Sequence, residues 1–224
     1  MLRIHVLTTG GTIDKVYGIS GELEIGPPAV DSLLAPVLTD VAFDVTSVLR
    51  VDSLDMTDDD RATLCAAVDA VDGDRVLITH GTDTMAATAR YLDQHLSPGS
   101  RDKVVVLTGA MQPAAMRVSD AAYNLGTATT AVQLLPPGVH IAMSGRVFAA
   151  GSVVKDTTRG IFVDAPSPSS DLDRILRWQT AGGEATLVGG GTELTVALLR
   201  CDGGEEVDRF TTTEDDVRRH LAGS

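Results

Sequence analysis

The stretch LTTGGTIDKVYG, residues 7–18, decides how the chain folds and where its chemistry lies. It closes an apolar run that begins at Leu2, and it crowds a Gly-Gly pair and three threonines into the exit of that run. One glycine is enough for a simple turn, whereas a second lets backbone and hydroxyl come close to another group. The stretch therefore predicts a strand over residues 2–9 that ends in a turn contacting something small.

Further apolar runs of strand length follow, with helix-like segments between them. Strands are predicted at 2–9, 42–51, 74–80, 103–109 and 139–145, and helices at 57–71, 83–96 and 119–135. The third and fourth strands are nearly continuous in Val, Leu and Ile, which is typical of parallel strands covered on both faces. This order predicts an α/β fold, a doubly wound and mostly parallel sheet with right-handed crossovers and helices on both faces.

The helix at 57–71 carries the clearest local signals. Thr57 is a suitable N-cap, and the three aspartates after it lie against the positive end of the helix dipole. Leu64, Val68 and Val71 then recur at helical spacing and form one apolar stripe.

The segment APSPSS (165–170) divides the chain. We expect residues 1–164 to form the sheet domain. Residues 165–224 are expected to form a small α+β appendage of one helix, a three-strand meander turned by glycine-rich loops, and a last helix. Since about 60 residues are marginal as an independent domain, the appendage is predicted to dock on the sheet domain or on a neighbouring subunit.

Composition narrows the class of protein. The 224 residues are 43% apolar and carry a net charge of −13, which disfavours binding to nucleic acid. No apolar run approaches the ~20 residues that cross a bilayer, and no secretory signal is visible. Cys65 and Cys201 lie far apart, without a CxxC motif or a histidine cluster nearby. We expect a cytoplasmic protein with reduced thiols, no metal, no cofactor, and neither nucleic acid nor membrane as a partner.

Lysine occurs only at Lys15, Lys103 and Lys155. Because arginine cannot lose its proton in a protein and lysine can, a lysine retained among arginines is a candidate for proton handling. For Lys103 the simpler expectation is a solvated surface side chain.

Small polar turns leave three of the predicted strands, namely TTGGTID (8–14), THGTDTM (79–85) and TGAMQP (108–113). Open α/β sheets bind ligands beyond the carboxyl ends of their strands, near the point where the strand order reverses. In a flavodoxin-like order the first and third strands are neighbours there, so these turns are predicted to form one pocket for a small ligand. A nucleotide is not indicated, since no turn has the GxGxxG or GK[ST] pattern.

Thr12 is the candidate nucleophile of that pocket. A hydroxyl needs a base near neutral pH. Thr82, Asp83 and Lys155 provide one as a relay, in which the lysine draws the proton through Thr82 and Asp83 holds the lysine deprotonated or in position. Two simpler interpretations stay open, with Thr12 as a turn residue capping a helix and Thr82 as the N-cap of the helix after the third strand.

The motifs LTTGGTIDK, SLDM, THGTDTM and LTGAMQP, taken in this order, resemble the bacterial-type asparaginase family. The likeness runs over residues 2–160 and covers only the family's larger, N-terminal domain. It implies an amidohydrolase that releases ammonia from L-asparagine through an acyl-enzyme. L-Glutamine or another small amide as substrate remains an alternative, and so does a catalytically silent module that binds amino acids.

The resemblance also implies the catalytic residues. Thr12 would be the primary nucleophile, and Tyr17 the mobile-loop tyrosine that assists it. Thr82, Asp83 and Lys155, the last in SVVKDTTRG, match the family's second threonine with its aspartate and lysine. The backbone N–H groups of Thr12 and Thr82 would form the oxyanion hole.

Substrate binding is implied in the same way. Ser53 would hold the substrate carboxylate and Asp83 its amino group, with Gly11 lining the site and the Ala110 carbonyl receiving the departing amide. Leu54 stands where the family usually has glutamine, so an apolar side chain replaces a hydrogen-bonding amide next to Ser53.

Full-length members carry a second domain that reaches over the neighbouring subunit's site with a carboxylate for the substrate amine. In this chain only the appendage is available for that role. Glu184, Glu193 and Asp171 are candidates, and nothing in the sequence selects among them. Sites shared between subunits predict a homo-oligomer, either a dimer or a tetramer.

Overall fold

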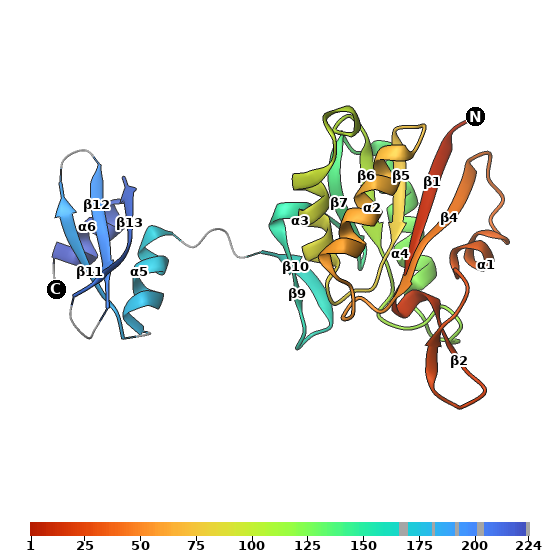
Figure 1. Cartoon of the computed structure of the whole chain (residues 1–224), viewed down its shortest axis with the longest axis horizontal. Helices are drawn as coiled ribbons and strands as arrows, with labels where there is room; N and C mark the ends of the chain where they lie inside the picture. The colour runs from red at the N-terminus through yellow and green to blue at the C-terminus, as the bar shows by residue number, and fades with distance from the viewer. Residues whose placement is uncertain (166–169, 181, 191–192, 201–203, 223–224) are drawn as a thin grey trace. The chain divides into compact units, whose positions relative to one another are not determined.

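The N-terminal unit is built on a six-stranded sheet in the order β4-β1-β5-β6-β7-β8 (Figure 1). The structure is a computed structural model that describes residues 1–165, 170–180, 182–190, 193–200 and 204–222. All neighbouring strands are parallel except the edge pair of β7 and β8. The strands are β1 (Arg3–Gly10), β4 (Ala42–Val51), β5 (Arg75–Thr79), β6 (Val104–Thr108), β7 (Gly138–Met143) and β8 (Arg146–Ala149).

This sheet confirms the predicted fold class. β1 lies between β4 and β5, so the first and third predicted strands are neighbours where the strand order reverses. Helices cover both faces, with α2 (Asp58–Ala70) and α3 (Met85–His95) on one side and α1 (Val30–Leu34) and α4 (Ala121–Leu134) on the other.

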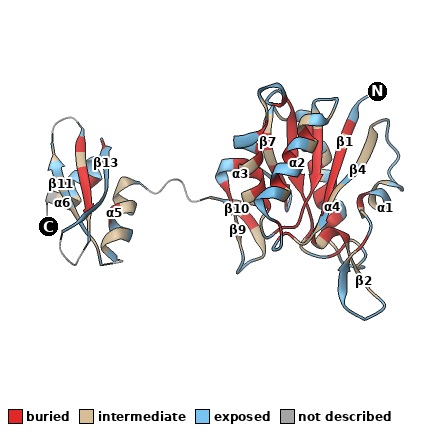
Figure 2. Cartoon of the chain, viewed as in Figure 1, coloured by how far each residue is buried: buried red, intermediate tan, exposed pale blue. Residues whose placement is uncertain are grey.

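Successive residues of a central strand pack alternately in the two core clusters, one on each face of the sheet. In β5, Val76 and Ile78 pack in the cluster that contains α2 and α3, while Leu77 packs in the cluster that contains α4. Figure 2 shows that buried residues concentrate in the central strands. Since both faces of these strands are covered, nearly every position is aliphatic.

The start of α2 is the one its sequence predicts. The Thr57 hydroxyl accepts a hydrogen bond from the Asp60 N–H at 3.2 Å, and the Asp60 carboxylate accepts one from the Thr57 N–H at 2.9 Å. This reciprocal pair is a capping box. Leu64 and Val68 are fully buried, and Val71 is the C-cap residue, partly buried against the same core.

Lys103 is buried at the other end of α2, so the expectation of a solvated side chain is wrong. Its Nζ donates to the carbonyl oxygens of Val68 at 2.8 Å and Val71 at 2.7 Å. A helix leaves its last carbonyls without intrahelical partners, and a cation there also faces the negative end of the dipole. The sequence alone does not reveal that this lysine, next to β6, lies against the end of α2.

Short antiparallel elements extend this unit beyond the predicted strands. β8 returns beside β7 after a turn at Ser144 and Gly145, where φ is 55° and 75°. Two hairpins carry predicted site residues, Tyr17 on the first and Lys155 on the second. They are β2 (Lys15–Tyr17) with β3 (Leu23–Ile25), and β9 (Val153–Asp156) with β10 (Ile161–Asp164), and short 3₁₀ helices span Thr12–Asp14, Pro98–Ser100 and Ala150–Ser152.

The chain divides into two compact units, Met1–Ala165 and Pro166–Ser224. The second contains an antiparallel sheet in the order β11-β12-β13, with a core centred on Ile175, Val196 and Val217. Its elements are α5 (Asp171–Thr180), β11 (Glu184–Gly189), β12 (Leu194–Leu199), β13 (Glu206–Thr212) and α6 (Asp215–Ala222), which confirms the predicted α+β appendage.

Some sequence expectations remain predictions. Most of the 165–170 linker and Cys201 lie outside the described residues, and the docking of the appendage is untested. Cys65 is a free, buried thiol. In the part of the chain that the structure describes, none of the helices combines the length and apolarity that crossing a bilayer requires.

Replacing Lys103 with methionine should lower the free energy of unfolding by about 1–3 kcal/mol, because buried carbonyl groups at the end of α2 lose their donor. Urea unfolding measures the change. The matched control is Arg101→Met, since Arg101 is exposed and its loss should change the value by less than about 0.5 kcal/mol. Equal stability of the two variants would contradict the capping role of Lys103.

Candidate active site

The turn after β1 depends on two glycines in the left-handed region of backbone space. Gly10 has a φ of 92° and Gly11 a φ of 81°, and the 3₁₀ helix Thr12–Asp14 begins directly after them. A Cβ on Gly11 would lie 2.4 Å from the backbone N and Cα of Gly81, in the turn after β5. Both the backbone angle and the available space therefore require glycine at position 11. The turns after the first and third predicted strands meet as the strand order predicts.

Ser53 packs on the other side of Gly81. A Cβ on Gly81 would lie 2.5 Å from the Ser53 Oγ, and the Thr84 hydroxyl donates to the Ser53 carbonyl at 2.8 Å. The segment that follows β4 is thereby held against the β5 turn. Gly11, Gly81 and Ser53 form a continuous stack at this edge of the sheet.

The turn after β6 joins the same edge. The Ala114 N–H donates to the Ile13 carbonyl at 3.1 Å, one residue beyond Thr12, and the His80 N–H donates to the Thr108 carbonyl at 2.8 Å. These backbone contacts bring together the three turns that the sequence analysis placed in one pocket.

Asp120 and Asn124, near the start of α4, fix the conformation of that third turn. The Asp120 carboxylate accepts the Met111 N–H at 3.0 Å, and the Asn124 amide donates to the Gly109 carbonyl at 3.0 Å. Sequence reasoning did not single out this pair. The sequence signal for this pair is weak. It consists of a carboxylate and an amide four residues apart at the start of a helix that follows a turn predicted to contact the ligand.

Lys155 contacts both partners of its predicted relay. Its Nζ donates to Thr82 Oγ1 at 2.8 Å and to Asp83 Oδ1 at 2.6 Å. The side chain of Lys155 is 13% exposed and that of Asp83 is 39% exposed. A chain separation of more than 70 residues is closed here because the β9–β10 hairpin returns to the β5 turn. The ion pair fits the positioning part of the role expected for Asp83.

Neither predicted threonine caps a helix. Gly11 is the N-cap of the 3₁₀ helix that begins at Thr12, and Thr84 is the N-cap of α3. The capping interpretations of Thr12 and Thr82 are therefore wrong, since each helix begins at a different residue from the one assumed. Within the described residues the Thr12 hydroxyl makes no hydrogen bond, so it is available to a ligand.

The remaining predicted residues differ in exposure. Ala110 is fully buried within the turn after β6. Ser53 is also buried, and its Oγ has no hydrogen-bond partner among the described residues. Tyr17 on β2 and Leu54 are both exposed, Leu54 at 72%. The supply of a carboxylate by Glu184, Glu193 or Asp171 of the appendage stays a prediction.

His80 lies within the β5 turn, and the sequence analysis assigned it no role. Its Nδ1 lies 2.7 Å from the Gly81 carbonyl oxygen, and its Nε2 lies 3.1 Å from the Met56 sulfur. Burial lowers the pKa of His80 to about 4, so the ring is neutral near pH 7. The carbonyl can only accept, which assigns the proton to Nδ1.

Asp14 anchors the segment that follows Thr12. Its Oδ1 accepts the Ala29 N–H at 2.7 Å, and its carbonyl accepts the Gly26 N–H at 2.7 Å. Burial raises the pKa of the Asp14 carboxyl to about 6, although the Ala29 hydrogen bond and the Arg50 charge oppose that shift. Sequence reasoning missed this residue, because an aspartate after a glycine turn is usually solvated.

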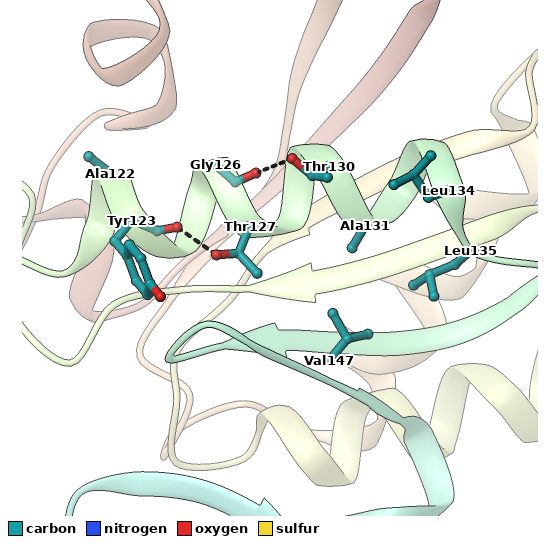
Figure 3. Close-up of a pocket in the computed structure, with 9 residues that line it drawn as sticks. All are labelled: Ala122, Tyr123, Gly126, Thr127, Thr130, Ala131, Leu134, Leu135 and Val147. Atoms are coloured by element: carbon teal, nitrogen blue, oxygen red, sulfur yellow. Dashed lines mark hydrogen bonds between the residues drawn. The ribbon is translucent and has the colours of Figure 1, made fainter.

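A hollow of about 640 Å³ lies elsewhere, along α4 (Figure 3). Tyr123, Leu134 and Val147 are among its lining residues, and none of the lining residues is charged. An amino-acid ligand needs partners for its carboxylate and its ammonium group. The hollow therefore does not suit the predicted ligand, whereas the meeting of the three turns does.

Comparison with known proteins gives matches over the first unit. The family model for the asparaginase N-terminal domain matches residues 3–165. The probable periplasmic L-asparaginase of Haemophilus influenzae is 32% identical over 169 residues, which are 71% of this chain and 48% of that protein. The glutaminase-asparaginase of Acinetobacter glutaminasificans is 33% identical over 175 residues, which are 71% of this chain and 50% of that protein.

A solved structure gives the same result. The thermostable L-asparaginase from Thermococcus kodakarensis is 30% identical, with a TM-score of 0.66, over 75% of this chain and 52% of its own. The chain spans about half the length of the curated relatives it matches.

Replacing Asp14 with asparagine should remove a pH dependence of stability. The folded-state pKa of about 6 lies above the ordinary value of an aspartate carboxyl, so the protonated carboxyl stabilises the fold, and this contribution is lost as pH rises through about 6. Asparagine keeps the acceptor for Ala29 without the charge. We expect equal stability below pH ~4 and a gain of about 2–3 kcal/mol at pH 8.

Chemical denaturation from pH 4 to pH 8 measures this difference. Asp31→Asn, on the exposed surface of α1, is the matched control and should follow the wild type throughout. A constant difference between Asp14→Asn and the wild type over this range would refute the buried-carboxyl interpretation.

Proposed function

The chain belongs to the asparaginase family through that family's N-terminal domain, and from this premise we propose that it deamidates L-asparagine to L-aspartate and ammonia. The contact of Lys155 with Thr82 and Asp83, next to the turn that presents Thr12, carries the proposal. A hydroxyl without an intramolecular partner and a lysine linked to a second hydroxyl are the groups that acyl transfer requires.

The proposed reaction has two steps. The Thr12 oxygen attacks the side-chain amide carbon. Its proton moves toward Lys155 through the Thr82 hydroxyl, to which Lys155 is hydrogen-bonded. The C–N bond then breaks, and the nitrogen leaves as ammonia after taking a proton. Water attacks the resulting ester, which releases aspartate and restores the Thr12 hydroxyl. Tyr17 assists Thr12 in this proposal.

Backbone donors would stabilise the charge that develops on the amide oxygen. We assign this role to the N–H groups of Thr12 and Thr82, which follow the closely packed Gly11 and Gly81. The loss of one such donor usually costs about 10²–10³ in rate. The Ala110 carbonyl would accept a hydrogen bond from the leaving nitrogen.

The substrate's amino-acid end would be held by Ser53 and Asp83. The unpaired, buried Ser53 hydroxyl is satisfied when it donates to a carboxylate, which requires the side chain to turn outward. One carboxylate oxygen of Asp83 accepts a hydrogen bond from Lys155, and the side chain is partly exposed, so Asp83 is suited to bind an ammonium group. Leu54 offers no hydrogen bond, which leaves this end of the substrate held by fewer contacts than glutamine would provide.

Because of Leu54, L-glutamine or another small amide is the second candidate substrate. One relative, a glutaminase-asparaginase, is named for both activities. A silent amino-acid-binding module is the rival from another class, and the retention of Thr12 and Lys155 argues against it.

We also propose a homo-oligomer, dimer or tetramer, located in the cytoplasm. The small size of the second unit supports association, since few residues stabilise it alone. The free Cys65 thiol fits a reducing compartment. The name of the Haemophilus relative points to the periplasm instead.

Ammonia release from L-asparagine, L-glutamine and D-asparagine tests the proposal. We expect release by the wild type, a loss on the order of 10³-fold or more in Thr12→Ala, and a loss on the order of 10²–10⁴-fold in Lys155→Met. Thr130→Ala, on the exposed side of α4, is the matched control and should keep full activity.

Thermal unfolding must first establish that all the variants fold. Absence of ammonia release by folded wild type would favour the binding module. An acyl group trapped on any residue other than Thr12 would reject the assigned nucleophile. Unchanged turnover in Lys155→Met would refute the relay.

A further inference from the structure

The β2–β3 hairpin that carries Tyr17 is tied to residues 50–52 by charged side chains. On β2, the Lys15 Nζ lies 2.6 Å from Asp52 Oδ2. On β3, the Ile25 carbonyl accepts from the Arg50 Nε at 2.8 Å. Each strand of the hairpin therefore has its own contact with the segment that leads into Ser53.

Asp52 faces the hairpin with one oxygen and the Ser53 turn with the other. Its Oδ1 accepts the Leu54 N–H at 3.2 Å, while its Oδ2 pairs with Lys15. The preceding residue, Val51, accepts the Gly11 N–H at 3.0 Å. One carboxylate thus connects Tyr17's hairpin with the backbone around the serine expected to hold the substrate.

The hairpin needs such anchors. It contains only three residue pairs, and an isolated two-stranded hairpin is at best marginally stable in water. Its tip is open to solvent, with Ile19 fully exposed. At the base, Asp14 fixes the chain entering β2 through its hydrogen bonds with Ala29 and Gly26.

The Lys15–Asp52 pair is suited to this role by its surroundings. The two side chains are 24% and 25% exposed, so solvent screens them less than a surface pair. The hydrogen bond from Lys15 is the main cause that holds the pKa of Asp52 below its ordinary value, so the carboxylate stays charged near neutral pH.

We propose that Lys15 and Asp52 are positioning residues that keep Tyr17 at a fixed position relative to Ser53. This inference rests on the proposed function for the roles of Tyr17 and Ser53. It assigns Lys15, the first of the three lysines, a task that the family motifs do not give it. Loss of the pair lets the hairpin move away, while Ser53 stays in place through its carbonyl contact with Thr84. Turnover should then fall more than substrate affinity.

Hydrogen exchange of the amides in residues 17–25 measures the hairpin directly. Lys15→Met and Asp52→Asn should each speed that exchange three- to tenfold, and the double variant should be no faster than either. Lys15→Arg should restore the wild-type rate. Arg3→Met is the matched control, because Arg3 pairs with Asp44 at the opposite end of β1 and β4.

Steady-state kinetics with L-asparagine supplies the second readout. We expect kcat to fall three- to tenfold in Lys15→Met and Asp52→Asn, with KM changed less than twofold and kcat restored in Lys15→Arg. A merely structural role would lower the thermal midpoint and would not separate kcat from KM in this way.

The outcomes separate this inference from the proposed function. Unchanged exchange in both single variants, or strictly additive effects in the double variant, overturns the positioning role even when ammonia is released. If the wild type releases no ammonia, the proposed function fails, and the exchange data alone decide whether the pair holds the hairpin.

Discussion

The contact between Gly11 and Gly81 is the constraint on which the rest of the site depends. Two turns from neighbouring parallel strands touch backbone to backbone, at a distance that leaves no room for a Cβ. Thr12 and Thr82 each follow one of these glycines directly. Their relative position is therefore set by main-chain packing on a rigid aliphatic sheet, and not by flexible side chains. Ser53, against the other side of Gly81, is fixed by the same contact.

The same edge of the sheet carries polar groups that lower stability. The hydroxyls of Thr8, Thr79 and Ser53 are buried without hydrogen-bond partners among the described residues. Burial disfavours the charged forms of Asp14 and His80, so the pKa of Asp14 is raised and that of His80 is lowered. The aliphatic strands beneath offset this cost. Residues that lower stability are expected to cluster at one end of an otherwise consistent fold where that end is a functional site.

The sequence predicted what depends on long periodic patterns and on strand ends. The five parallel strands, α2 to α4 and the meander were found because aliphatic runs and helical stripes are long enough to show a period. The relay of Thr82, Asp83 and Lys155 was proposed from residue chemistry and by resemblance, and its members meet because the β9–β10 hairpin returns to the β5 turn. The hairpins were missed because strands of three or four residues show no alternation. The burial of Lys103 and the Lys15–Asp52 pair depend on tertiary contacts that no local pattern encodes.

A double-mutant cycle on Gly11→Ala and Gly81→Ala tests the central constraint most directly, with the free energy of unfolding as the measurement. The backbone strain at position 11 is local and adds independently. The two steric clashes oppose each other at Gly81, because a Cβ at position 11 pushes Gly81 toward Ser53 and a Cβ at position 81 pushes it back. We predict that the double variant loses more than the sum of the single losses, by at least ~1 kcal/mol. Additive losses would contradict the account, since the two turns would then not be in contact.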